Sequence, residues 1–158
     1  MRIGIGMEVA RLTSTRQKGN QSQVVVRKFY EADGWKMHNQ GSQWRRIHGR
    51  WIPVGNDIWG AFDLIGLHAE FGFLFVQSKT GGSGIQEAKR RIESLPWPKN
   101  NTGLALPHFD MRTRVVIAIV KKHSRRGRPY GTYLRILRWD GTAWNVETVE
   151  LSKRSGEA

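Results

Sequence analysis

The chain has 158 residues, a length that fits one domain with its own hydrophobic core. It contains no cysteine, which excludes disulfides, thiolate metal sites and cysteine nucleophiles. Its 26 Lys and Arg residues outnumber 13 Asp and Glu residues, so the formal charge is +13. We expect a polyanionic partner, because neutralising phosphates releases condensed counterions.

Nucleic acid is a better candidate for that partner than an anionic membrane surface. The longest apolar runs, such as residues 115–120, are far too short to cross a bilayer, and nothing resembles a secretory signal. The sequence also lacks a long basic amphipathic helix of the kind that lies on lipid. We therefore expect a soluble, cytoplasmic protein with no membrane partner.

The first third of the chain contains one predicted helix. Residues 1–17 form an arm to which the sequence assigns no structure. Apolar residues at helical spacing predict a helix over 21–33, and Gly34 is placed to end it. Residues 37–57 are dense in Trp, Arg and His and are punctuated by Gly and Pro, which indicates a loop or a loose hairpin.

The rest of the chain alternates predicted strands with one helix. Strands over 61–67 and 72–79 are separated by five residues, which indicates a hairpin. A glycine-rich connector then leads to an amphipathic helix over 85–95. The remaining predicted strands are 114–120, 132–139 and 143–151, the last two joined at Asp140-Gly141. This order predicts an α/β fold with a central mixed β-sheet flanked by helices.

Polar residues of the predicted hairpin fall on one face if Leu67 lies opposite Phe73. In that register Asp63 is opposite Gln77, and opposed residues have Cβ atoms about 4.5–5.5 Å apart. Lys79 shares their face because strand side chains alternate. A carboxylate, an amide and an ammonium group beside a basic surface suit phosphodiester hydrolysis. In such a site a hard divalent cation takes oxygen ligands, while a lysine orients water or offsets developing charge.

These residues also carry a resemblance to a known family. Asp63, followed after a hairpin by Gln77-Ser78-Lys79, resembles the core of the PD-(D/E)xK nuclease superfamily, with glutamine in place of the usual second acid. The resemblance implies a restriction-endonuclease-like core.

Within that superfamily the chain most resembles the archaeal-type Holliday junction resolvases, which phages also carry. KGNQSQ at 18–23 and FYEADGW at 29–35 resemble the start and end of their first helix. FDLIGL and FVQSK resemble their metal-binding hairpin. The resemblance spans about residues 18–120.

The resemblance also implies a catalytic set, formed by an acid on the first helix, the hairpin aspartate, and the acid and lysine of the second motif. By position these are Gln23, Asp63, Gln77 and Lys79. A neutral amide can ligate a metal through its oxygen but lacks the charge that holds Mg²⁺, so either Glu31 or Asp57 compensates or Gln23 weakens the site. The implied ligands of Mg²⁺, or of Mn²⁺ in its place, are Asp63, Gln77, the Ser78 backbone, Asp57 and Glu31.

Most of these residues also have a simpler structural interpretation. Asp57 follows a Gly-Asn pair and fits a turn, and Glu31 fits a solvated helix face. Gln77 fits a polar position on a half-buried strand, and Lys79 fits a solvated strand end. Asp63, an acid inside an otherwise apolar strand, favours a functional role.

Basic residues in several segments are the expected phosphate contacts. They are Lys18, Arg45, Arg46, Arg50, Lys89, Arg90, Arg91, Lys121, Lys122, Arg125, Arg126 and Arg128. Trp44 and Trp51 are interleaved with arginines and are candidates to contact DNA at a distorted or unpaired region. Trp35, Trp59 and Trp139 are expected in the core.

The resemblance implies a metal-dependent, structure-selective endonuclease that resolves four-way junctions in branched double-stranded DNA. It also implies a homodimer, because symmetric incision needs two sites at a fixed separation. The sequence leaves three alternatives open. These are a repair or restriction-type nuclease acting on linear duplexes, a DNA-binding module that has lost its metal site, and an RNA-binding accessory protein.

Overall fold

The computed structural model describes residues 15–39, 43–54, 57–99, 112–122 and 131–151. The described helices are α2 (Thr15–Ala32) and α3 (Ile85–Glu93). The described strands are β1 (Lys36–Asn39), β2 (Gln43–Ile47), β3 (Arg50–Val54), β4 (Leu64–His68), β5 (Gly72–Thr80), β6 (Thr113–Lys122), β7 (Thr132–Trp139) and β8 (Trp144–Glu150).

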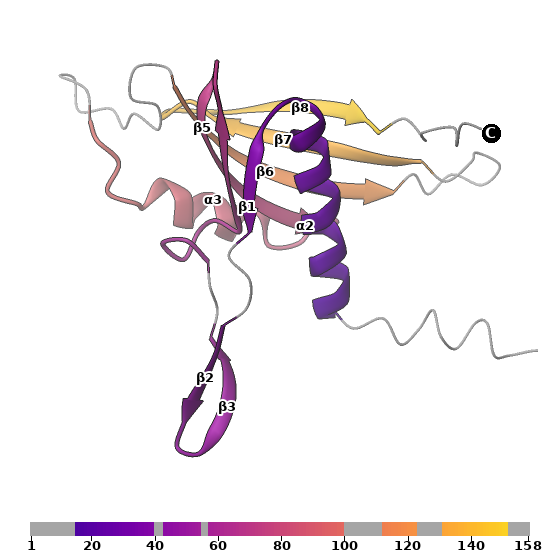
Figure 1. Ribbon diagram of the computed structural model, residues 1–158. Coiled ribbons are helices and arrows are strands. Elements are labelled where there is room, and N and C mark those ends of the chain that lie inside the picture. The colour runs from indigo at the N-terminus through magenta and orange to yellow at the C-terminus, as the bar shows by residue number, and fades with distance from the viewer. Residues whose placement is uncertain (1–14, 40–42, 55–56, 100–111, 123–130, 152–158) are drawn as a thin grey trace, which may run out of the picture.

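Six of these strands form one mixed sheet, and the α/β fold expected from the sequence is confirmed at that level. The order is β1-β4-β5-β6-β7-β8, while β2 and β3 form a separate two-stranded sheet (Figure 1). Strands β5 and β6 are parallel and are joined through α3; the other neighbours are antiparallel. Neither helix in the described part of the chain is long and apolar enough to span a membrane.

The core lies on both faces of the sheet. Alternate residues of Val115–Val120 on β6 point to opposite faces, and all six are buried. This continuous apolar run is typical of a central strand covered on both sides. Val26 and Tyr30 of α2 pack on one face, whereas Ala88 and Ile92 of α3 pack on the other. Each helix therefore covers its own face of the sheet.

The hairpin formed by β4 and β5 has the register that the sequence predicts. Leu67 lies opposite Phe73, and Leu64 lies opposite Val76. The hairpin turns at Gly72, whose φ of 85° favours glycine. This register fixes which side chains of the two strands meet at their far end.

Some predicted boundaries were wrong. Helix α2 begins at Thr15 rather than at residue 21, and β4 begins at Leu64 rather than at 61. The strand starts late because Ile58–Phe62 closes a tight turn through an antiparallel bridge. The segment 37–57, expected as a loop or loose hairpin, supplies edge strand β1 as well as the β2–β3 hairpin.

Trp59 was wrongly expected in the core. Trp35 and Trp139 are buried, with 3% and 4% of their surface exposed, but 62% of Trp59 is exposed. Trp59 has a φ of 54° in the turn that precedes β4. Its ring nevertheless contacts the ring of Phe75, with the two centroids 5.3 Å apart.

Candidate active site

Asp63 lies directly before β4 and is held by the facing end of β5. Its backbone N–H donates to the carbonyl of Val76 at 2.8 Å. Its Oδ2 accepts hydrogen bonds from Gln77 Nε2 at 3.0 Å, from the Ser78 backbone N–H at 2.9 Å and from Ser78 Oγ at 3.0 Å. The predicted proximity of Asp63 and Gln77 is therefore present, and three donors fix the orientation of the carboxyl group.

Gln77 and Lys79 face a small cavity at the start of α3. The cavity has a volume of about 80 Å³ and is lined by Asp57, Ala61, Gln77, Lys79, Gly84, Glu87, Ala88 and Arg91. A Cβ atom added to Gly84, the residue that precedes α3, would lie 3.7 Å from Lys79 Nζ. The ammonium group of Lys79 is thus directed toward the helix rather than into open solvent.

Asp57 and Asp63 form a pair of acids beside this cavity. Burial and the nearby Asp57 carboxyl raise the pKa of Asp63 from 3.8 to about 6, and the hydrogen bonds from Ser78 partly offset this rise. Asp57 also forms a turn, since its carbonyl accepts from Gly60 N–H at 3.0 Å. Asp57, which the sequence assigned to a turn, therefore lies in that turn and also raises the pKa of Asp63.

Glu87 is a cavity residue that the sequence reasoning missed. It lies in the first turn of α3, and its Oε1 accepts from Arg91 Nη2 at 2.6 Å, so both side chains lie at the cavity. No local spacing in the sequence marks Glu87, because its position depends on how α3 packs back against the strand end after the connector. Arg91, expected as a phosphate contact, is therefore partly engaged by an acid.

Two predicted site residues lie elsewhere on α2. Gln23 Oε1 accepts a hydrogen bond from Asn39 Nδ2 at 3.1 Å, and Gln23 does not line the cavity. Glu31 lies two turns further along α2, where it forms an exposed ion pair with Arg27 at 3.5 Å. The structure does not bring either residue together with Lys79.

The donors beside the cavity suit a hard cation. Among the described residues, no three His, Asp or Glu side chains gather closely enough to hold a metal ion by themselves. The available oxygen donors are the carboxylates of Asp57 and Asp63 and the amide oxygen of Gln77. A divalent cation fits this set, because a positive charge would favour the ionised form of Asp63, which burial and the nearby Asp57 carboxyl disfavour. The backbone N–H of Ser78 is directed at Asp63, so this residue orients the carboxylate.

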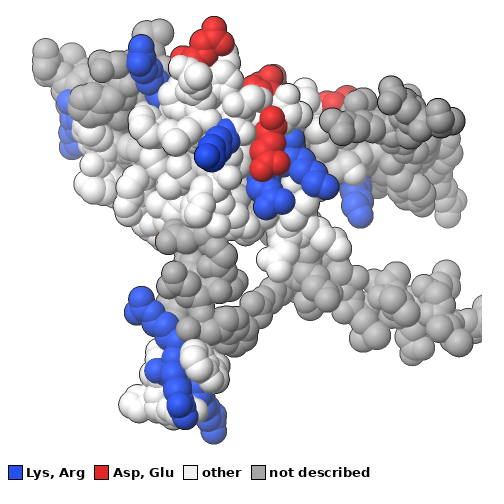
Figure 2. All heavy atoms as spheres, viewed as in Figure 1, with Lys and Arg blue, Asp and Glu red and all other residues white. Residues whose placement is uncertain are grey.

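The predicted phosphate contacts are distributed over separate surfaces. Arg45, Arg46 and Arg50 lie on the β2–β3 hairpin, where Lys and Arg side chains gather without acidic neighbours (Figure 2). On α3, Arg90 is exposed, and the Nζ of Lys89 lies 5.7 Å from the centre of the Trp144 ring.

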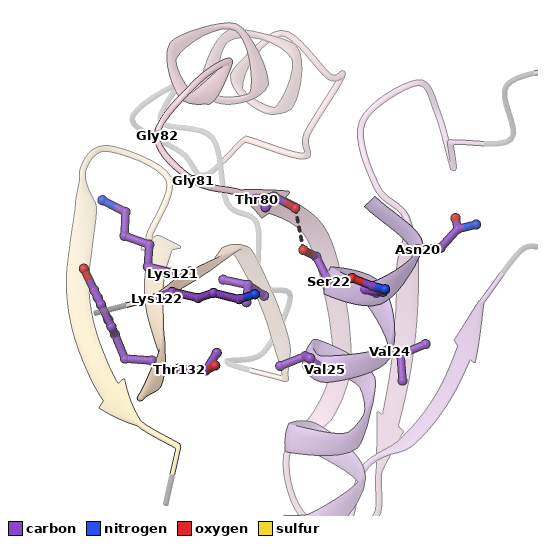
Figure 3. A pocket seen from close by; sticks show the side chains of 13 residues that line it. Asn20, Ser22, Val24, Val25, Thr80, Gly81, Gly82, Lys121, Lys122 and Thr132 are labelled. Atoms are coloured by element: carbon purple, nitrogen blue, oxygen red, sulfur yellow. Dashed lines mark hydrogen bonds between the residues drawn. The ribbon is translucent and has the colours of Figure 1, made fainter. Parts of the chain in front are cut away.

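Lys121 and Lys122 lie at the end of β6 beside a broad groove of about 1140 Å³ (Figure 3). Across the groove the side chains of Ser22 on α2 and Thr80 on β5 are hydrogen-bonded to each other. The side chain of Lys18, and the whole of Arg125, Arg126 and Arg128, lie outside the described residues.

Comparisons with protein-family models, with curated proteins and with solved structures find no match for this chain.

Proposed function

We propose that this protein is a metal-dependent, structure-selective endonuclease that hydrolyses phosphodiester bonds in branched double-stranded DNA, with four-way junctions as its substrate. One observation carries the proposal. The carboxyl group of Asp63 is hydrogen-bonded to Gln77, and Gln77 shares a cavity with Lys79 and a second acid, Asp57. Acids, an amide oxygen and a lysine at one strand end form a suitable set for phosphodiester hydrolysis.

Each side chain of the site has a separate task. Asp57, Asp63 and Gln77 would hold Mg²⁺ or Mn²⁺, which supplies Lewis-acid chemistry when bound. The ammonium group of Lys79 orients the attacking water or offsets negative charge that develops on the phosphate. Ser78 keeps the Asp63 carboxylate in place through two hydrogen bonds to Oδ2.

The proposal extends to the architecture and the assembly. Helix α2 and the β4–β5 hairpin follow each other in the order that the resemblance requires, which supports a restriction-endonuclease-like core. Junction resolution needs two sites at a fixed separation, which a two-fold homodimer supplies. Recognition would depend on junction shape and phosphate positions rather than on base edges.

Cleavage of a synthetic four-way junction with Mg²⁺ or Mn²⁺ tests the function. The wild-type protein should cut the junction faster than a linear duplex of the same sequence. Lys79→Ala should lower the cleavage rate by roughly 100-fold or more while junction binding is retained. Lys36→Ala, which removes an exposed lysine from β1, is the matched control and should cut normally. The proposal would be contradicted if Lys79→Ala cut the junction at the wild-type rate, or if the wild type did not cut it with either metal.

A DNA-binding module without catalysis is the second candidate, and one feature of the site favours it. The group that contacts Asp63 from β5 is the amide of Gln77 rather than an acid, and the position expected to supply an acid from α2 is Gln23. Calorimetric titration with Mg²⁺ and Mn²⁺ separates the candidates. Absence of metal binding, with and without junction DNA, would favour the binding module.

A further inference from the structure

The β2–β3 hairpin is a separate ribbon that stands away from the main sheet (Figure 1). Its strands are joined by the two residues His48 and Gly49, with φ values of 49° and 77°. Positive φ at both positions gives the tight turn whose twist matches that of a β-ribbon. An isolated two-stranded hairpin is only marginally stable in water. Within the described residues β2 and β3 pair only with each other, which favours a role in binding for this ribbon.

The composition of the ribbon indicates an anionic partner. Residues 43–54 contain three arginines and no Asp or Glu, and all three arginines are exposed. Figure 2 shows basic side chains gathered on the protruding part of the molecule, with no acidic side chain beside them in this view. The ribbon also leaves much of Trp51 (65%) and Ile52 (41%) exposed to solvent. Exposed apolar area among cations is typical of a surface that binds nucleic acid through both phosphates and bases.

The strand register separates these side chains into two faces. Arg46 lies opposite Trp51, so a guanidinium group and an indole ring project side by side from one face. Arg45 opposes Ile52 and therefore projects from the other face, as does Arg50. The ribbon thus presents cations on both faces and the accessible ring of Trp51 beside Arg46, while the side chain of Trp44 lies outside the described residues.

We propose that the β2–β3 hairpin is a DNA-binding arm, in which Trp51 stacks on an unpaired or unstacked base at the branch point while the arginines contact the flanking phosphates. The inference rests on the proposed function and names the feature of the substrate that the protein recognises. A two-stranded ribbon has the width of the B-DNA major groove, and a junction exposes bases that continuous duplex keeps stacked. A second copy of the chain is a poorer occupant, since each copy carries a charge of +13 and the ribbon offers no acid to it.

The first experiment measures Trp51→Ala on two DNAs, a four-way junction with 2-aminopurine at the branch point and a continuous duplex. We expect junction affinity to fall roughly 5- to 100-fold, duplex affinity to change little, and the quenching of 2-aminopurine to be lost. Trp51→Phe should restore most of the affinity, because it retains a ring that can stack. Phe73→Ala, which removes an exposed ring from β5, is the control and should bind like the wild type. Unchanged junction binding, or an equal loss on both DNAs, would overturn the role of Trp51.

The second experiment tests the arginines through the salt dependence of binding. Replacing Arg45, Arg46 and Arg50 by Gln should lower the slope of log K against log salt by up to about 3, since each lost phosphate contact removes about 0.9. A control with Lys28, Lys36 and Arg138 replaced by Gln removes the same charge from exposed positions on the body. If the control lowered the slope by the same amount, the proposal that the β2–β3 hairpin is a DNA-binding arm would be refuted. Thermal unfolding of both triple variants verifies that the sheet is intact.

The combined outcomes distinguish the arm from the endonuclease. Normal junction binding by the hairpin variants, together with metal-dependent cutting by the wild type, would refute the arm and leave the endonuclease standing. Loss of junction binding in the hairpin variants, with no cutting by the wild type, would support the arm and refute the endonuclease. A dimer that becomes monomeric in the hairpin variants without loss of DNA affinity would assign the ribbon to a second copy and refute the arm.

Discussion

At the scale of single residues, Asp63 is held in an environment that disfavours its charge. Burial and the neighbouring Asp57 carboxyl raise the pKa of Asp63 to about 6. Because the folded pKa is above the ordinary value of 3.8, the fold favours the protonated form. Protonated Asp63 contributes stability to the fold that is fully present below about pH 4 and is lost as the pH rises through about 6.

Asp63→Asn should therefore remove a pH dependence from the metal-free protein. The free energy of unfolding of the wild type should fall between pH 4 and 7 by about 2 kcal/mol more than that of Asp63→Asn, since one pKa unit corresponds to about 1.4 kcal/mol and most of the shift from 3.8 to about 6 lies in this window. Urea unfolding at both pH values measures the difference. Glu70→Gln, at an exposed acid in the β4–β5 turn, is the control and should behave like the wild type. If the stability of Asp63→Asn changed with pH as that of the wild type does, the environment that raises the pKa of Asp63 would be contradicted.

The contact of Asp63 with Gln77 could be predicted from the sequence, but the contribution of Glu87 could not. That prediction assumed Leu67 opposite Phe73, and the structure has this register; a slip of one residue would turn every side chain to the other face. Glu87 approaches the site only because α3 returns to the sheet after the connector. That approach depends on how the helix packs rather than on any local spacing.

At the scale of elements, the turn at Gly72 sets the register on which the site depends. A Cβ atom at this position would lie 2.2 Å from the carbonyl oxygen of Arg112, and the φ of 85° is unfavourable for any other residue. The same carbonyl accepts a hydrogen bond from Phe73 N–H at 2.7 Å, so it cannot move away freely.

Gly72→Ala should lower the free energy of unfolding by about 2–4 kcal/mol, from the combined backbone strain and steric overlap. Gly82→Ala is the matched control, because an added Cβ at Gly82 meets no atom within 4 Å. Chemical denaturation of the two variants makes the comparison. Equal stability of the two variants would show that the close approach of Arg112 to Gly72 does not constrain the turn.

The elements that the sequence specifies poorly are those whose structure depends on a distant partner. Strand β1 has no alternating apolar pattern, and its position is set by pairing with β4. The first turn of α2 lacks the apolar spacing that predicted the rest of the helix. Strands β6 and β7 were predicted closely because each contains many apolar and β-branched residues within the strand itself.

At the scale of the whole molecule, the charge of +13 should dominate binding to any duplex. If the protein neutralises about six phosphates, its affinity for a linear duplex should fall about 1000-fold between 50 and 200 mM salt. Fluorescence anisotropy with a labelled duplex measures this dependence. Affinity that does not change with salt would show that the excess of basic residues serves something other than polyanion binding.

The ribbon and the acid pair are neighbours along the chain, and this proximity has a mechanical consequence. Val54 ends β3 and Asp57 lines the cavity, so only two residues separate them. A span of three residue steps reaches at most about 11 Å even when fully extended. This connection is too short to allow β3 to move far while Asp57 stays in place. A ligand that displaces the ribbon should therefore also displace Asp57. Glycines inserted between Val54 and Asp57 would allow the ribbon to move independently of Asp57 and would leave the side chains of both unchanged.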